Sequence, residues 1–388
     1  MYIFIMLAVL SLVLLFPAPA QGRAVNKPQT SEAIERQADL ARSRQHMTEA
    51  IALYRKALRQ RPTWVDGWWW LGSLLYEQDR FQEAKTAFAE FIKTSPDPGV
   101  GFAFLALCEY ETHDDEQSLN HFETWTKRGT PGPRELVEVA NFHRALLITR
   151  EGEFNKALFL LEDILSTKLE EFPALTEAMG IASLRMANLP EDYAPEKREL
   201  VWLAGKAAVR FSQEDFWGSD EYMRRLLLRY GGEPNVHYLC GNLLGLRRKY
   251  AEAAGEYRQE LQRFPGHVSA MIELALVQIQ NGNLSEAHAL ANQAAELEPK
   301  NSRAVYALGK SFLATDQFAE SARELEIAKR LSPESASVRY ALASAYKGLG
   351  RKTEAKREAD AFLSLQYARV HRKEQAESPA SPRVEDPK

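Results

Sequence analysis

A period of 34 residues within positions 234–369 constrains the fold of this chain more than any other sequence feature. Proline recurs with this spacing, and small residues recur with it at two further places in each period. These positions are Pro265, Pro299 and Pro333; Gly241, Ala275, Gly309 and Ala343; and Ala253, Ala287, Ser321 and Ala355. A fixed period of this length is typical of stacked repeats that each pack on their neighbours. We therefore expect a repeat array rather than a globular domain.

Each period has the composition of two helices joined by a turn. Small side chains such as Gly309 and Ser321 would let two antiparallel helices approach closely, while Leu308 fills the space around that contact. Gly282 and Gly350 suit the positive φ that ends a helix. The proline near the end of each period stops the second helix because it lacks an N–H. One such pair buries little apolar surface, so stability should come from stacking.

Similar but less regular units precede this stretch. Helix-sized patterns occupy residues 31–169, which we interpret as N-terminal units of the same kind. Residues 170–233 depart from the period, with a proline-containing loop at 188–197. We expect this part to be an irregular helical region that joins the N-terminal units to the regular units at 234–369.

The recurring residues resemble those of the tetratricopeptide repeat. The matching residues are Leu71, Gly72, Ala84, Phe88 and Pro96; Gly241, Tyr250, Ala253, Tyr257 and Pro265; Leu274, Ala275, Ala287, Ala294 and Pro299; and Leu308, Gly309, Phe318, Ala328 and Pro333. The resemblance covers about residues 31–369. It implies an all-α fold, a solenoid in which antiparallel helix pairs form a right-handed superhelix. It also implies a concave groove that binds peptides or proteins, and it implies no reaction.

The phase of the repeats predicts which side chains line that groove. The fifth position of the regular units is often tyrosine, and the ninth position is often polar. In the N-terminal half Trp68 fits a packing position, so Trp69 would face the groove, because successive helical residues lie about 100° apart. The predicted partner-binding residues are Trp69, Tyr238, Asn242, Arg303, Tyr306, Lys310 and Tyr340. The alternatives are an ordinary solvated face and, for Trp69, cover by a neighbouring helix.

One known binding mode of the family is not expected here. Some members hold a terminal carboxylate with a Lys and an Asn on one helix and a Lys and an Arg two units later. Asn242 matches this arrangement, but Tyr238 stands in place of the first Lys and Ala307 in place of the Arg.

No motif in the chain predicts catalysis, and we expect no catalytic, cofactor-binding or metal-binding residues. The segment 304–311 ends in Gly-Lys-Ser but lacks the first glycine of a phosphate-binding loop and no strand precedes it. The acidic and histidine residues between His113 and His121 read as a solvated turn and helix start rather than a metal site. If the chain were an enzyme, its pocket would have to lie in the irregular region 170–233.

Charge and cysteine content exclude further classes of function. The formal net charge of −4 gives no reason to expect nucleic-acid binding through bulk charge. The two cysteines, Cys108 and Cys240, belong to different repeats, so we expect no disulfide between them.

The two ends of the chain differ from the repeats. Residues 1–20 are uncharged and mostly apolar, with Ala18 and Ala20 at a candidate cleavage site, which predicts a secretory signal peptide. The apolar segment is short for a membrane span, although an uncleaved segment could act as an anchor. Residues 21–30 read as a linker, and residues 370–388 read as a disordered, charged tail.

These features together predict a non-catalytic scaffold that is exported to the periplasm or the cell exterior and binds a protein or peptide in its groove. An alternative is an accessory or carrier subunit of an envelope enzyme complex that handles polysaccharide. In that case Trp68, Trp69, Trp70 and Trp125 would contact sugar rings.

Overall fold

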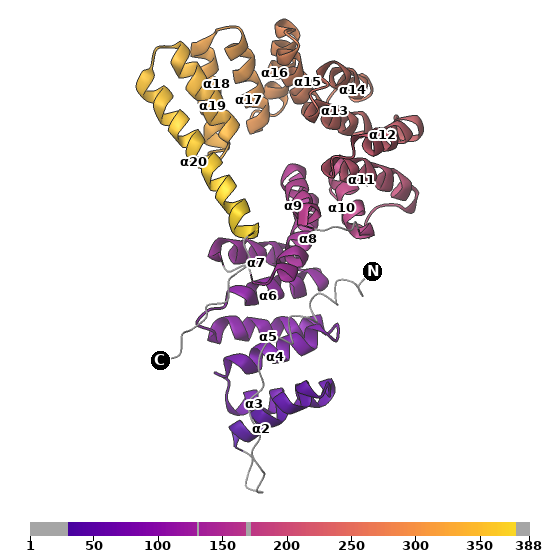
Figure 1. Ribbon diagram of the computed structural model, residues 1–388, viewed down its shortest axis with the longest axis vertical. Coiled ribbons are helices and arrows are strands. Elements are labelled where there is room, and N and C mark those ends of the chain that lie inside the picture. The colour runs from indigo at the N-terminus through magenta and orange to yellow at the C-terminus, as the bar shows by residue number, and fades with distance from the viewer. Residues whose placement is uncertain (1–29, 130–131, 168–171, 378–388) are drawn as a thin grey trace. The chain divides into compact units, whose positions relative to one another are not determined.

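The protein is described by a computed structural model that covers residues 30–129, 132–167 and 172–377. Within these ranges the chain forms 19 α-helices, α2–α20, one short 3-10 helix, η1, and no strand (Figure 1). The predicted all-α repeat fold is therefore confirmed. The predicted signal peptide, nearly all of the linker and the last part of the tail lie outside the described residues.

The chain divides into two compact units, unit 1 at residues 1–222 and unit 2 at residues 223–388. Helix α12 (Phe216–Tyr230) contains the division. The helices of unit 1 are α2 (Ser31–Ser43), α3 (Met47–Gln60), α4 (Val65–Tyr76), α5 (Phe81–Thr94), α6 (Gly99–Glu111), α7 (Asp115–Arg128), α8 (Arg134–Arg150), α9 (Phe154–Thr167), α10 (Pro173–Ser183), η1 (Pro195–Lys197) and α11 (Arg198–Ser212).

Unit 2 is a row of four helix pairs. These helices are α13 (Val236–Leu246), α14 (Tyr250–Arg263), α15 (Val268–Gln280), α16 (Leu284–Leu297), α17 (Ser302–Ala314), α18 (Phe318–Leu331), α19 (Ala336–Gly348) and α20 (Lys352–Glu377). We call the first helix of each pair the A helix and the second the B helix. Helix α20 continues past residue 369, where we expected the repeats to end. Tyr367 stands where the preceding pairs have proline, so nothing stops the helix there.

The recurring small residues bring the two helices of a pair into close contact. A Cβ added at Gly241 would lie 2.6 Å from the ring of Tyr257 on the partner helix, so only glycine fits without a shift. Where serine occupies the B-helix position, its hydroxyl donates to a carbonyl of the A helix: Ser321 to Gly309, 2.8 Å, and Ser118 to Ala106, 2.8 Å. The small residues thus set the spacing within each pair.

The turn between the two helices of a pair requires a residue in the left-handed region. Gly152, Gly282 and Gly350 adopt this conformation at no steric cost. Other turns use residues with side chains, at φ values between 52° and 61°. These residues are Gln45, Asp79, His113, Arg185, Glu214, Arg248 and Asp316.

The A helices of unit 2 lie side by side on its inner surface. Contacts join α13 to α15, α15 to α17 and α17 to α19. The B helices do not contact one another to the same extent in the described part of unit 2, and long side chains link them instead, as Arg258 on α14 does with Glu286 on α16 at 2.9 Å. Because the A helices are the closer set, they line the concave side (Figure 1).

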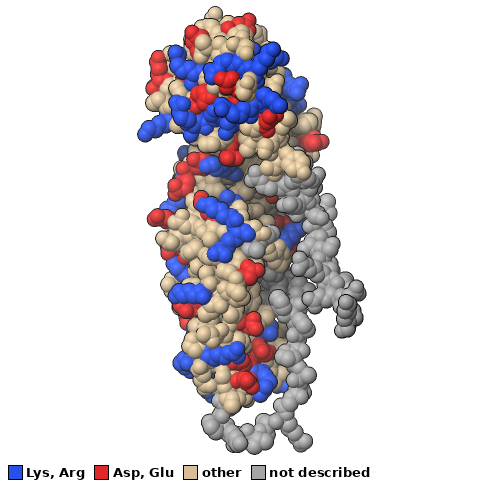
Figure 2. Space-filling view, turned by 90° about the vertical axis from the view of Figure 1, so that its left-hand side faces the viewer, with Lys and Arg blue, Asp and Glu red and all other residues tan. Residues whose placement is uncertain are grey.

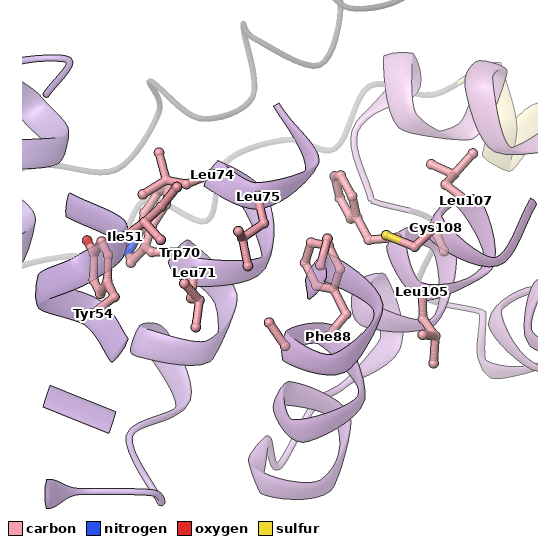
Figure 3. Close-up of a cluster of buried hydrophobic side chains, with 14 of the residues drawn as sticks. Ile51, Tyr54, Trp70, Leu71, Leu74, Leu75, Phe88, Leu105, Leu107 and Cys108 are labelled. Carbon is pink, nitrogen blue, oxygen red and sulfur yellow. The ribbon is translucent and has the colours of Figure 1, made fainter. Parts of the chain in front are cut away.

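The core of unit 1 begins with an apolar cluster shared by α2–α8. Tyr54, Leu74, Leu75 and Phe88 are buried within it (Figure 3). Cys108 is also buried, and this burial raises the pKa of its thiol. The thiol therefore behaves as a small apolar group.

Candidate partner-binding surface

The surface formed by α13, α15, α17 and α19, which we call the A-helix face of unit 2, contains six of the seven predicted binding residues. Asn242 lies on α13, three of the residues lie on α17, and Tyr340 lies on α19. Tyr238 lies on α13 as well, but the structure places it differently from our prediction.

The side chain at the fifth position of each repeat is buried in the first two helix pairs of unit 2 and more exposed in the last two. Tyr238 is 4% exposed and Ile272 is 2% exposed, whereas Tyr306 is half-buried and Tyr340 is 60% exposed. The Tyr238 ring packs 5.0 Å from the His267 ring, which belongs to the next pair. The prediction that Tyr238 lines the groove is therefore wrong, because the following repeat covers it.

Two other predicted residues are engaged within the protein. Arg303 on α17 forms an ion pair with Glu273 on α15, and this carboxylate raises the pKa of the guanidinium. The Asn242 side-chain oxygen accepts a hydrogen bond from the Tyr257 hydroxyl at 2.8 Å. Both residues remain partly accessible, so they border the surface. The charge of Arg303 is already matched by Glu273, however, and the side-chain oxygen of Asn242 already accepts a hydrogen bond. Sequence reasoning missed Glu273, which lies on the preceding A helix, 30 residues before Arg303.

Lys310 is the one predicted residue whose charge is not matched. It is half-buried on α17, and in the described part of the chain it makes no ion pair. Burial lowers the pKa of its ammonium group. Leu276 on α15 and Ser344 on α19 occupy the same repeat position on the flanking A helices, where one side chain is apolar and the other polar.

The structure therefore brings together Tyr306, Lys310 and Tyr340 as an accessible group on adjacent A helices, with Arg303 beside them. A half-buried ring and an exposed ring, on the same and the neighbouring helix as a partly desolvated cation, suit a ligand that combines an apolar side chain with an acceptor or carboxylate.

Trp69 lies in unit 1 and is a packing residue. Its ring is 5.2 Å from the rings of Phe91 and Phe104 and 5.8 Å from that of Phe88. The side chain is half-buried, and a neighbouring helix covers it, as the alternative interpretation held. The prediction of Trp69 as an anchor is therefore wrong, because α5 and α6 supply aromatic partners.

The other tryptophans considered for sugar binding are also engaged in packing. Trp70 is 8% exposed, with Arg42 over its ring at 3.6 Å, and Trp125 is 4% exposed. The Trp68 indole donates a hydrogen bond to the Pro62 carbonyl at 2.7 Å. Stacking on a sugar would require Trp70 and Trp125 to leave their present contacts.

The segments that resemble chemical motifs have structural roles. Gly309 is buried in the middle of α17, where Leu325 packs against it, so the segment 304–311 is helix rather than a phosphate-binding loop. Asp114 pairs with Lys85 at 2.6 Å, and His121 contacts Glu109 at 2.6 Å. Over the described ranges no group of His, Cys, Asp and Glu is arranged to hold a metal ion.

Comparisons with known proteins agree with this geometry at the level of the repeat. Sequence models of the tetratricopeptide repeat match residues 35–99, 246–310 and 306–366. The chain therefore contains tetratricopeptide repeats in both units. Such repeats generally mediate protein–protein interaction and suggest an interaction scaffold. No curated protein matches significantly.

Solved structures of MamA are among those similar to this chain. The RS-1 ArsTM double mutant of MamA is 16% identical, with 45% of this chain and 97% of that chain covered and a TM-score of 0.39. MamA from residue 41 to its end, from Desulfovibrio magneticus RS-1, is 18% identical, with 46% and 97% covered and a TM-score of 0.37. These TM-scores are too low to add to the assignment, which rests on the repeat matches and the helix pairs.

The described helices were also compared with the requirements of a membrane span. None of them combines the length and apolarity needed to cross a bilayer.

Proposed function

We propose that this protein is a non-catalytic scaffold that binds a segment of a partner protein on the A-helix face of unit 2. The observation that carries the proposal is Lys310, a half-buried ammonium with no ion pair in the described structure, on the same helix as the half-buried Tyr306 and on the helix beside that of the exposed Tyr340. A desolvated cation gains from a charge-assisted hydrogen bond, and a partner carboxylate or carbonyl would supply it.

The proposed mechanism is display of a preformed surface. The A helices are held in place by helix pairing, so few of their side chains need to be ordered when a partner binds. Tyr306 and Tyr340 would bury apolar side chains of the partner. Lys310 would fix its direction, while the pair of Arg303 and Glu273 would border one side.

We also propose that the scaffold acts outside the cytoplasm. The support is the uncharged, apolar segment 1–20 followed by small residues at Ala18 and Ala20. Sequencing the N-terminus of the protein purified from its native host tests this step. A mature terminus at Gln21 is the expected result, and an intact Met1 in a cytoplasmic fraction would contradict export.

The binding step is tested with the double variant Tyr306→Ala/Lys310→Glu in crosslinking pull-downs from native extract, analysed by mass spectrometry. We expect partners captured by the wild-type protein to fall at least tenfold, with helicity unchanged by circular dichroism. Lys300→Glu is the matched control, because Lys300 is exposed and lies in the turn before α17. Equal capture by the double variant and the control would rule out this surface.

A further inference from the structure

The last helix pair of unit 2 presents a second surface, which we call the end face. It consists of Tyr340 on α19 and Lys356 and Leu363 on α20. Tyr340 is 60% exposed, Leu363 is 61% exposed, and Lys356 is also exposed. Lys356 and Leu363 lie seven residues apart, on one side of α20, and the Tyr340 ring packs 5.4 Å from the ring of Phe362 on the same helix.

The repeat period shows what normally covers each of these positions. Counting back by the repeat length, the equivalents of Leu363 are Lys329, Ala295 and Leu261, all partly buried against the following pair. The equivalents of Lys356 are Ala322, His288 and Ala254, and those of Tyr340 are Tyr306, Ile272 and Tyr238. None of these equivalents is exposed. In every earlier pair of unit 2, the next A helix lies over this face.

One of the equivalents shows how a polar residue behaves at the position of Lys356. His288 on α16 contacts the Ser311 hydroxyl on α17 at 3.0 Å, and its ring lies 4.8 Å from that of Phe312. A polar side chain at this repeat position therefore contacts the A helix of the next pair. At Lys356 the same contact would present an ammonium group, which requires an acceptor, best of all a carboxylate.

Charge at this end of unit 2 favours the same conclusion. Lys and Arg side chains gather over the upper part of the face in Figure 2, the part that contains α18–α20 in Figure 1. Lys352 and Lys356 are exposed on one side of α20, and neither makes an ion pair in the described part of the chain. Asp360, one turn after Lys356, is also exposed, but two ammonium groups against one carboxylate leave this side of α20 positive, which favours an acidic ligand.

The end face is continuous with a packed interface of the same protein. Leu325, Leu342 and Tyr346 form the apolar cluster between α18 and α19, and Ala355 on α20 packs against it. A helix laid on the end face would extend this cluster by one layer, as α17 and α19 extend the layers before them.

We infer that the end face of α19–α20 binds an amphipathic α-helix of a partner protein, in the position that a further A helix would take. The helix places apolar side chains on Tyr340 and Leu363 and a carboxylate opposite Lys356. The end face shares Tyr340 with the A-helix face, whereas Lys356 and Leu363 belong to the end face alone, so variants of these two residues test it apart from the function proposed above.

The chain supplies a probe for this site. The probe is a peptide with the sequence of residues 302–314, which form the A helix that covers α16. Ser311, the residue that His288 contacts, is replaced by Glu so that the peptide can meet Lys356. A staple on the opposite face of the peptide keeps it helical. We expect it to bind the full-length protein in calorimetric titrations. Leu363→Arg should weaken binding at least tenfold. Lys356→Glu should weaken it at least fivefold, and a peptide with Lys in place of Ser311 should restore binding to that variant.

Leu297→Arg is the matched control, because Leu297 is an exposed leucine on a B helix away from the end face. It should leave affinity unchanged. Absence of binding to the wild-type protein, or equal binding to Leu363→Arg and the control, would overturn the inference. So would self-association of the wild-type protein that Leu363→Arg abolishes, because a second copy would then occupy the end face.

Discussion

Gly180 on α10 lies directly against the Val201 carbonyl on α11, so close that an added Cβ would stand 2.1 Å from the carbonyl oxygen. Gly205 on α11 makes the reciprocal approach, with its Cβ position 1.9 Å from the Thr176 carbonyl oxygen. The backbones of α10 and α11 are thus in direct contact. A backbone carbonyl cannot move aside for an added Cβ as a flexible side chain could.

Gly180→Ala should therefore destabilise unit 1, by about 1–3 kcal/mol or more, since the backbones must separate. Gly255→Ala is the matched control, because Gly255 lies in helix α14 with nothing near its Cβ position. It should stabilise its helix by roughly 0.5–1 kcal/mol through helix propensity. Amide hydrogen exchange across α10–α11 and α14 measures both effects, and equal protection in the two variants would contradict the packing argument.

His143 makes unit 1 sensitive to acid. The side chain is buried, its Nδ1 lies 2.8 Å from the Val139 carbonyl oxygen, and its ring packs 4.7 Å from that of Tyr110. Burial lowers the pKa of His143 below its ordinary value of about 6.5. Since the unfolded chain then binds a proton more readily than the folded chain, the stability from neutral His143 is present above pH 6.5 and is lost as pH falls below it.

We expect the melting temperature of the wild-type protein to fall between pH 7 and pH 5, and His143→Phe to reduce this fall. The variant keeps an aromatic ring against Tyr110 but cannot be protonated. Differential scanning calorimetry at several pH values measures the difference, and parallel curves for the two proteins would show that His143 is not responsible.

Glu358 holds α20 to the preceding pair. It is 1% exposed and contacts Arg339 at 2.7 Å and Lys329 at 3.3 Å. Burial alone would raise the pKa of Glu358, but its hydrogen bonds to Arg339 and Lys329 lower it. Glu358→Gln should cost about 3 kcal/mol, because the partly buried Arg339 loses its carboxylate partner, whereas Lys329 keeps its ion pair with Glu326. Faster hydrogen exchange in α18–α20, with no change in α13–α16, is the expected readout.

Tyr238 and Tyr340 share a position in the repeat, but mutation of Tyr238 should mainly lower stability and mutation of Tyr340 should mainly lower partner binding. Tyr238→Ala removes a ring that is 4% exposed and should cost about 3–5 kcal/mol. Tyr340→Ala removes a ring that is 60% exposed and should cost less than about 1 kcal/mol. Tyr340→Ala should instead weaken partner capture. Chemical denaturation of both variants, beside the pull-down, would separate the two roles.

The repeat period predicted the helix pairs because the residues that recur with it are those that form the contacts within a pair. The small residues at Gly309 and Ser321 were expected to let helices approach, and the Ser321 hydroxyl indeed reaches the Gly309 carbonyl. Burial of the candidate binding residues depends instead on the next pair. Tyr238 is covered by His267, and Trp69 meets Phe104, so a side chain that looks accessible within its own repeat is enclosed by its neighbour.

The turns within the helix pairs affect how many destabilising substitutions such a chain can tolerate. Arg248 and Asp316 hold left-handed backbone that glycine holds at Gly282 and Gly350, at a cost on the order of 1 kcal/mol for each side chain. Because each turn lies inside its own repeat, exchanging these residues for glycine should release stability in additive steps. Stability lost through a substitution elsewhere in the array could therefore be regained one turn at a time.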